Sequence, residues 1–232
     1  MSEQNKISRR RFLTLTGGAV GATALACCGL TALGTRQPAV KFNESNCGGE
    51  NEMSDKILVA YASKCGSTGE VAEAIGQVLC DAGAVVDVRL AQNVTDVSPY
   101  RAVIVGSAIR SSKWLPEAVE FVEMHRETLS RVPVAYFLTS LTTVQDTEET
   151  RRVAVACLDP VREQVPQVQP VDVGIFAGKL DFGKLPFMYR LVWPLTPGGS
   201  VGAGDYRDWE AIRAWADGLR PALLGASMGG NA

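Results

Sequence analysis

The chain has 232 residues, of which 46% are hydrophobic, and this is enough apolar material to bury the core of one full domain. Its formal net charge at pH 7 is −2, and no long run of like charges follows the N-terminal region. Nucleic-acid binding, which needs a basic surface, is therefore disfavoured.

The N-terminal segment, residues 1–36, differs in composition from the rest of the chain and is predicted to be a targeting segment. Ser8 precedes three arginines, then Phe12 and Leu13, and a weakly apolar stretch rich in Gly, Ala and Thr follows. This pattern resembles the twin-arginine export signal, Ser/Thr-Arg-Arg-x-Phe-Leu. The resemblance implies the twin-arginine translocase as a partner and a domain that is extracytoplasmic, and membrane-anchored or membrane-associated. An N-terminal membrane anchor preceded by positive residues is the alternative.

Residues 37–55 are polar, contain Pro and Gly and show no apolar period, so we expect a linker. Before it, Cys27 or Cys28 is a candidate site of lipid attachment. The six cysteines show no metal-ligand spacing, and no metal site is predicted. Cys80 and Cys157 fall in helix-like stretches, where a small buried residue is expected. An oxidising compartment would permit a disulfide, but the sequence favours no particular pair.

From residue 56 onward, short β-branched runs alternate with longer amphipathic ones, which is typical of a parallel sheet covered by helices. The expected strands are 56–62, 84–90, 101–107, 132–139 and 168–178. The expected helices are 68–82, 115–130, 147–165 and 205–224. The fold class is therefore α/β, a three-layer sandwich with a five-stranded parallel sheet in the order 2-1-3-4-5, in a domain that spans 56–225. In such sheets the ligand binds at the carboxyl ends of the strands, which directs attention to the loops 63–68, 107–114 and 139–146.

The first of these loops consists of Ser63, Lys64, Cys65, Gly66, Ser67 and Thr68. Because it opens a helix, free backbone N–H groups and the helix dipole converge there, and an anion such as phosphate is expected. Gly66 permits close approach of the backbone, the hydroxyl groups can donate hydrogen bonds, and Lys64 can add a positive charge. The alternative is an ordinary turn in which Ser67 or Thr68 caps the helix. Neither a P-loop nor a Gly-x-Gly-x-x-Gly spacing is present, so ATP and NAD are weaker candidates.

The stretch ILVAYASKCGSTGEVAEAI, residues 57–75, resembles the flavodoxin phosphate loop, Ser/Thr-x-x-Gly-x-Thr. Residues 100–129, 171–193 and 198–216 are similar to the menaquinone-dependent protoporphyrinogen IX dehydrogenases and related flavodoxin-domain proteins. The resemblance implies a flavodoxin-like sandwich that binds FMN. It also implies an oxidoreductase that acts on a porphyrinogen-like substrate and passes electrons to a membrane quinone or a redox partner protein.

Carried over to this chain, the resemblance assigns the FMN phosphate to the loop 63–68. It places the flavin ring beside Ser107, Ala108, Ile109 and Arg110, with the opposite edge of the site at Ser140, Leu141, Thr142 and Thr143. The family's Gly-Ala-Ser-Ile-Arg reads Gly-Ser-Ala-Ile-Arg here. Trp114 is expected either to stack on the ring or to pack into the core. Arg110 is expected to stabilise a reduced flavin, to bind an acidic group at the rim, or to be solvated.

Residues 178–199 combine apolar and aromatic residues with two lysines and an arginine. This composition fits an interfacial membrane element, the wall of a quinone tunnel, or a helix that covers the sheet. The only histidine, His125, lies in an acidic helix and is assigned no catalytic role, and no catalytic side chain is predicted because the cofactor performs the redox step. Two alternatives to an enzyme stay open, namely a non-enzymatic electron carrier and a flavodoxin-like binding module without cofactor.

Overall fold

A computed structural model describes residues 38–48, 56–195 and 200–225 of the chain. The predicted targeting segment, with Cys27 and Cys28, lies outside the described residues. Among the helices that are described, none is both long enough and apolar enough to cross a bilayer.

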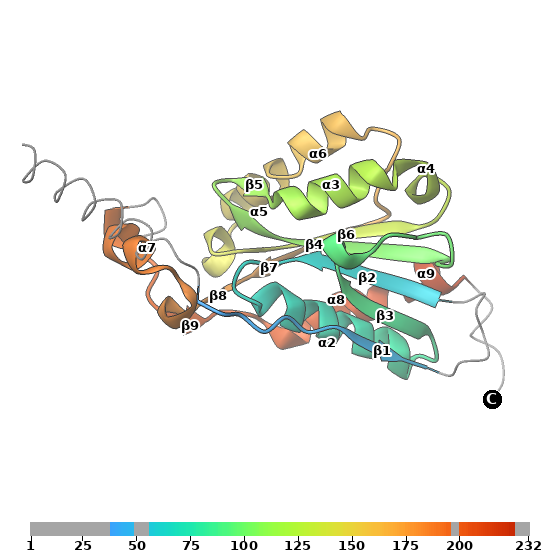
Figure 1. Ribbon diagram of the computed structural model, residues 1–232, viewed down its shortest axis with the longest axis horizontal. Coiled ribbons are helices and arrows are strands. Elements are labelled where there is room, and N and C mark those ends of the chain that lie inside the picture. The colour runs from blue at the N-terminus through green and yellow to red at the C-terminus, as the bar shows by residue number, and fades with distance from the viewer. Residues whose placement is uncertain (1–37, 49–55, 196–199, 226–232) are drawn as a thin grey trace, which may run out of the picture.

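The central sheet is mainly parallel, and its strands lie in the order β1-β3-β2-β4-β6-β7 (Figure 1). Their bounds are β1 Ser45–Cys47, β2 Lys56–Ala62, β3 Val85–Leu90, β4 Ala102–Arg110, β6 Val134–Ser140 and β7 Val173–Ala177. The five parallel strands are β3, β2, β4, β6 and β7, which is 2-1-3-4-5 when they alone are numbered along the chain. Two short antiparallel strands that the sequence did not predict extend the sheet: β1 on β3, and β5 (Lys113–Trp114) on β4.

The β2 strand shows why the middle of the sheet reads as an uninterrupted apolar run. Six of its seven residues are buried, because helices cover both faces of the sheet. Its alternate side chains enter two separate cores: Tyr61 belongs to the cluster that contains Ile75 of the first helix, and Leu58 belongs to the cluster that contains Phe121 of the second. The three-layer α/β class is thereby confirmed.

Helices cover the two faces in two groups (Figure 1). One face carries α2 (Ser67–Asp81), α8 (Trp209–Gly218) and α9 (Arg220–Leu224), and the other carries α3 (Pro116–Met124), α4 (Arg126–Leu129), α5 (Glu148–Ala156) and α6 (Asp159–Gln164). Three of the expected helices, 115–130, 147–165 and 205–224, are each divided into two shorter helices. The backbone of His125 leaves helical geometry between α3 and α4, and Pro160 and Pro221 stand in the first turns of α6 and α9, where proline is tolerated because its missing N–H has no partner there.

The segment 38–48, expected to be part of a linker, instead packs along the domain, and we call it the strap. Its strand β1 pairs with β3, and Cys47 forms a disulfide with Cys80 of α2. The Tyr61 hydroxyl donates a 2.7 Å hydrogen bond to the Asn43 carbonyl oxygen, and burial raises the pKa of Tyr61 to about 12, so the donor stays protonated. Cys80 is thus a cross-linked residue rather than a simple buried one, whereas Cys157 is buried as expected.

After β7 the chain leaves the sandwich and returns only at α8. The strands β8 (Lys179–Leu180) and β9 (Gly204–Asp205) pair antiparallel and form the base of this excursion. Between them lie the 3₁₀ turn Phe182–Lys184, helix α7 (Phe187–Val192) and the 3₁₀ turn Trp193–Leu195. Figure 1 shows α7 standing away from both helical layers, so it does not cover the sheet.

Candidate functional site

The sequence-predicted residues meet at one edge of the molecule because parallel strands end on the same side. The loop 63–68 follows β2, the loop 140–143 follows β6, and β4 runs on into the hairpin that contains Arg110 and Trp114. This edge lies at the carboxyl ends of the strands, where ligands of open α/β sheets bind.

Gly66 shapes the predicted phosphate loop. It is the N-cap residue of α2 and adopts a left-handed conformation with φ of 86°, which glycine reaches without steric cost. Its N–H donates a 2.9 Å hydrogen bond to the Ser63 hydroxyl oxygen, so Ser63 closes the loop and keeps its own hydroxyl hydrogen for another acceptor. Neither Ser67 nor Thr68 caps the helix, which corrects the ordinary-turn interpretation. In the first turn of α2, the Gly69 and Glu70 N–H groups donate to the Gly66 carbonyl oxygen at 3.0 and 3.3 Å. The N–H groups of Ser67 and Thr68 precede these and have no carbonyl of the helix within reach.

Thr68 connects this loop to the end of β6. Its hydroxyl oxygen lies 2.9 Å from that of Thr139, and both residues are buried. Only one of the two hydroxyl hydrogens is used between them, so the other is left for an acceptor.

The sequence suggested that Lys64 adds its positive charge to the loop, but the structure directs that charge elsewhere. Its ammonium group forms an ion pair with Glu117 in the first turn of α3. Burial alone would raise the pKa of the Glu117 carboxyl, but the hydrogen bond and the charge of Lys64 lower it overall. The pair therefore joins the phosphate loop to the helix on the other face of the sheet.

Lys184 supplies a positive charge at the loop, which sequence reasoning missed. Its Nζ lies 3.7 Å from the point where a Cβ atom on Gly66 would stand. Burial raises the pKa of the neighbouring Cys65 thiol, and the charges of Lys184 and Arg110 oppose that rise. Two strap atoms also lie close to this Cβ position: Val40 Cγ1 is 3.2 Å from it and the Lys41 carbonyl oxygen is 3.3 Å from it. Glycine at position 66 is thus required by crowding as well as by φ.

Arg207 is a second cation that the sequence did not reveal, and its side chain is only 2% exposed. Its guanidinium donates a 3.1 Å hydrogen bond to the Ser67 carbonyl oxygen and lies 2.8 Å from a Glu70 carboxylate oxygen. Burial would lower the pKa of Arg207, but its bonds to Asp205 and Glu70 raise it overall. Arg207 therefore attaches the start of α2 to β9.

Two predicted flavin neighbours in the hairpin after β4, Ser107 and Trp114, make their contacts within the protein. The Ser107 hydroxyl is fully buried, accepts a 2.9 Å hydrogen bond from the Leu115 N–H and donates one to the Ala108 carbonyl. Trp114 is 4% exposed and packs edge-on against Tyr136 with ring centroids 5.1 Å apart, which supports the core alternative over ring stacking. Its indole N–H is buried without a partner in the described part of the chain.

Arg110, Ala108 and Ile109 remain accessible at this edge. Ala108 and Ile109 are half-buried, whereas Arg110 is exposed and holds its guanidinium carbon 4.8 Å from the ring centroid of Tyr189 in α7. The contact is of the cation–π type and connects the hairpin to the excursion.

The loop after β6 is internally hydrogen-bonded. Ser140 accepts a 3.1 Å bond from the Thr142 N–H on its hydroxyl oxygen, and the Thr143 hydroxyl donates to the Ser140 carbonyl at 3.2 Å. Thr143 is buried, Leu141 is half-buried and Thr142 is exposed. Leu141 and Thr142 are therefore the accessible side chains at this side of the site.

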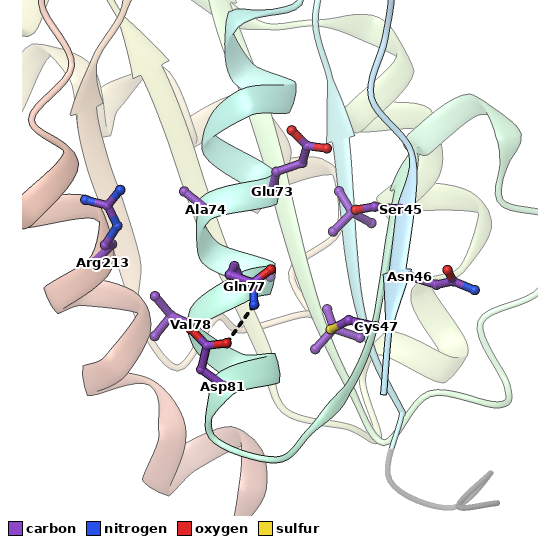
Figure 2. A pocket seen from close by; sticks show the side chains of 12 residues that line it. Ser45, Asn46, Cys47, Glu73, Ala74, Gln77, Val78, Asp81 and Arg213 are labelled. Atoms are coloured by element: carbon purple, nitrogen blue, oxygen red, sulfur yellow. Dashed lines mark hydrogen bonds between the residues drawn. The ribbon is translucent and has the colours of Figure 1, made fainter. Parts of the chain in front are cut away.

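A separate cavity of about 480 Å³ lies on the flank of the molecule, between the strap, α2 and α8 (Figure 2). Figure 2 shows α2, with Glu73, Gln77 and Asp81, between Arg213 of α8 and Ser45 to Cys47 of the strap. No residue of the predicted site lines this cavity. In the described part of the chain no group of metal ligands is found either.

Comparison with protein families decides how this edge is interpreted. A family model described as flavodoxin domain matches residues 58–194. The chain belongs to the flavodoxin domain family. Its match includes the loop 63–68, the hairpin after β4 and α7. This membership supports FMN as the cofactor.

Curated relatives share low identity with the chain. A protoporphyrinogen IX dehydrogenase (quinone) from Leishmania major is 26% identical over 174 residues, which cover 71% of this chain and 74% of the relative. The protein of the same name from Escherichia coli K12 is 22% identical over 169 residues, covering 69% of this chain and 92% of the relative. Oxidised flavodoxin 2 from Bacillus cereus is 19% identical with a TM-score of 0.43, covering 73% of this chain and 97% of that structure.

The residues of the loop fit the phosphate of FMN. Gly66 provides the left-handed turn, Ser63 and the Thr68–Thr139 pair retain hydroxyl hydrogens, and Lys184 brings a cation. Since these groups are donors or positive charges, they suit a dianionic phosphate better than a neutral ligand. With the relatives, the loop supports a flavin oxidoreductase or electron carrier.

Proposed function

We propose that this flavodoxin-domain protein is an FMN-dependent oxidoreductase that takes electrons from a small reduced donor and passes them to a quinone. The observation that carries the proposal is the loop 63–68, with left-handed Gly66 beside Lys184 at the carboxyl edge of the sheet. When bound, FMN supplies the two-electron redox chemistry, and the protein sets its position and environment.

Each part of the edge has a separate role in this proposal. The loop 63–68 binds the phosphate. Ala108, Ile109 and Leu141 flank the ring with apolar surface, and Arg110 holds positive charge at the exposed rim. No general acid or base is assigned. Ser107 and Trp114 act as support, because their side chains are buried in contacts within the chain.

The donor class is taken from the relatives' names. Both relatives are named protoporphyrinogen IX dehydrogenase (quinone), so we propose a porphyrinogen-like donor and a membrane quinone as acceptor. To test this, the full chain would be assayed for oxidation of protoporphyrinogen with a soluble menaquinone analogue. Saturable turnover is expected. Reduction and reoxidation by redox proteins alone, without saturable small-molecule kinetics, would instead identify an electron carrier.

The location is proposed to be extracytoplasmic, reached by the twin-arginine route. The Ser8 to Leu13 motif supports this, and so does the Cys47–Cys80 disulfide, because disulfides persist mainly in oxidising compartments. Replacing Arg9 and Arg10 by lysine should leave the protein in the cytoplasm of a bacterial host with the translocase. Equal export of that variant would argue against the route.

A further inference from the structure

The excursion carries most of the large apolar side chains that the described residues leave exposed. We call six of them the α7 patch: Phe187, Met188, Tyr189, Leu191, Val192 and Leu195. Phe187 is 64% exposed, Leu191 65% and Leu195 86%. The other exposed large apolar residues in the described ranges stand singly: Met124 in α3, Val153 in α5 and Val171 before β7. A contiguous patch of this kind marks an interaction surface, whereas single exposed residues are ordinary.

The patch is held in place by its own internal contacts. The Arg190 guanidinium donates hydrogen bonds to the carbonyl oxygens of Leu185 at 3.0 Å and Gly183 at 3.1 Å. The Trp193 indole N–H donates a 3.0 Å bond to the Val201 carbonyl, and its ring packs edge-on against Phe182. Arg190 and Trp193 thus bond to carbonyl oxygens of the excursion, while the six side chains of the α7 patch stay exposed.

The charge of the excursion differs in sign from that of the chain. Residues 178–208 contain Lys179, Lys184, Arg190 and Arg207 against Asp181, Asp205 and Asp208, which gives +1, whereas the whole chain carries −2. The exposed Arg110 lies over Tyr189 and adds another cation beside the patch. An apolar and aromatic face rimmed by basic residues complements the surface of a bilayer that contains anionic lipids.

The strap places the N-terminal part of the chain at the same edge. Val40 and Lys41 lie beside Gly66, where Lys184 of the excursion also reaches. Figure 1 shows the strap beginning beside β8 and β9. The predicted targeting or anchor segment, residues 1–36, therefore joins the described structure on the side where the α7 patch is exposed.

We propose that the α7 patch docks into the interface of an anionic lipid bilayer and turns the carboxyl edge of the sheet toward the membrane. Docking would give the protein access to a membrane quinone, and in this respect the inference rests on the proposed function. The test of docking does not require enzymatic turnover. A lipid surface is favoured over a second copy that packs patch to patch, because that contact would bring the cations beside the two patches, such as Arg110, close together, whereas anionic lipid attracts them.

Tryptophan quenching separates docking by the patch from tethering by the N-terminal segment. The chain has four tryptophans, Trp114, Trp193, Trp209 and Trp215, and none lies in residues 1–55. The full chain would be incorporated into vesicles of phosphatidylglycerol and phosphatidylcholine with brominated acyl chains. We expect quenching that disappears in Trp193→Phe, and at least a several-fold loss in the triple variant Phe187→Ser, Leu191→Ser, Leu195→Ser.

The matched control is the triple variant Met124→Ser, Val153→Ser, Val171→Ser, which removes similarly exposed apolar groups and should quench like the wild type. Quenching that is absent from the wild type, or unchanged in the α7 variants, would overturn the inference. A dimer in solution that the α7 triple variant dissociates, without quenching, would also overturn it. Quenching by a chain that fails to bind FMN would support docking and contradict only the proposed function.

Discussion

The side-chain oxygens of Thr68 and Thr139 lie 2.9 Å apart, and both residues are buried. Thr68 is the second residue of α2, which follows β2, and Thr139 stands near the end of β6. Since β4 lies between β2 and β6 in the sheet, this hydrogen bond spans a strand and connects two loops of the candidate site.

Replacing Thr139 by valine should therefore destabilise the fold. The substitution leaves the buried Thr68 hydroxyl without this partner, which costs about 1–3 kcal/mol. Urea unfolding of the purified protein would measure the loss. Thr139→Ser keeps the hydroxyl and is expected to retain most of the stability. Equal unfolding midpoints for the valine variant and the wild type would show that the bond contributes nothing.

Gly66→Ala should weaken FMN binding by at least tenfold. A Cβ atom there meets Val40 and Lys41, and the left-handed backbone costs a non-glycine residue roughly 1–2 kcal/mol. The free loop of the variant is expected to relax out of this conformation, so FMN binding has to restore the strain, which is about one order of magnitude in a binding constant. The dissociation constant can be read from the fluorescence of added FMN. Gly218→Ala is the matched control, because nothing lies within 4 Å of its Cβ position, and its FMN affinity should equal that of the wild type.

The Lys64–Glu117 pair should make stability depend on acidic pH. The pKa of Glu117 is lower in the folded protein, so its contribution is fully present above the unfolded-state pKa, about 4.3, and is lost as pH falls through the folded value. The melting temperature of Glu117→Gln should fall furthest below that of the wild type near neutral pH. The melting temperatures of the two proteins should converge in acid. Glu120→Gln, on the same helix, controls for loss of a surface charge. A deficit that grows toward acid would contradict the assignment.

The disulfide between Cys47 and Cys80 should stabilise the folded state by roughly 4 kcal/mol, because it closes a loop with a sequence separation of 33. The double variant Cys47→Ser, Cys80→Ser should melt at a lower temperature than the oxidised wild type. Reductant should lower the melting temperature of the wild type to that of the variant and leave the variant unchanged. A wild type that is insensitive to reductant would argue against the bridge.

The sequence predicted those parts of the structure that depend on local pattern. Apolar runs such as 56–62 identified the parallel strands. The hydroxyl-rich loop after the first strand predicted a phosphate site, and the structure places that loop at the carboxyl edge of the sheet. Ser67 and Thr68 appeared equally able to cap α2, and only the backbone of Gly66 decided against both.

Long-range partners were not predictable in this way. The strap has no apolar period, and its strand is only three residues long, so nothing in the sequence marked it as part of the sheet. Arg207 meets Ser67 across 140 residues, and Lys64 meets Glu117 across 53. A single sequence shows such residues only as charges, and their partners are set by the topology.

The measurement that tests the central claim most directly is the flavin content of the purified full chain, with the released flavin identified after denaturation. The phosphate-loop assignment predicts a yellow protein that releases FMN in near-equimolar amount. A colourless protein that binds no added FMN would contradict the assignment and indicate a flavodoxin-like binding module.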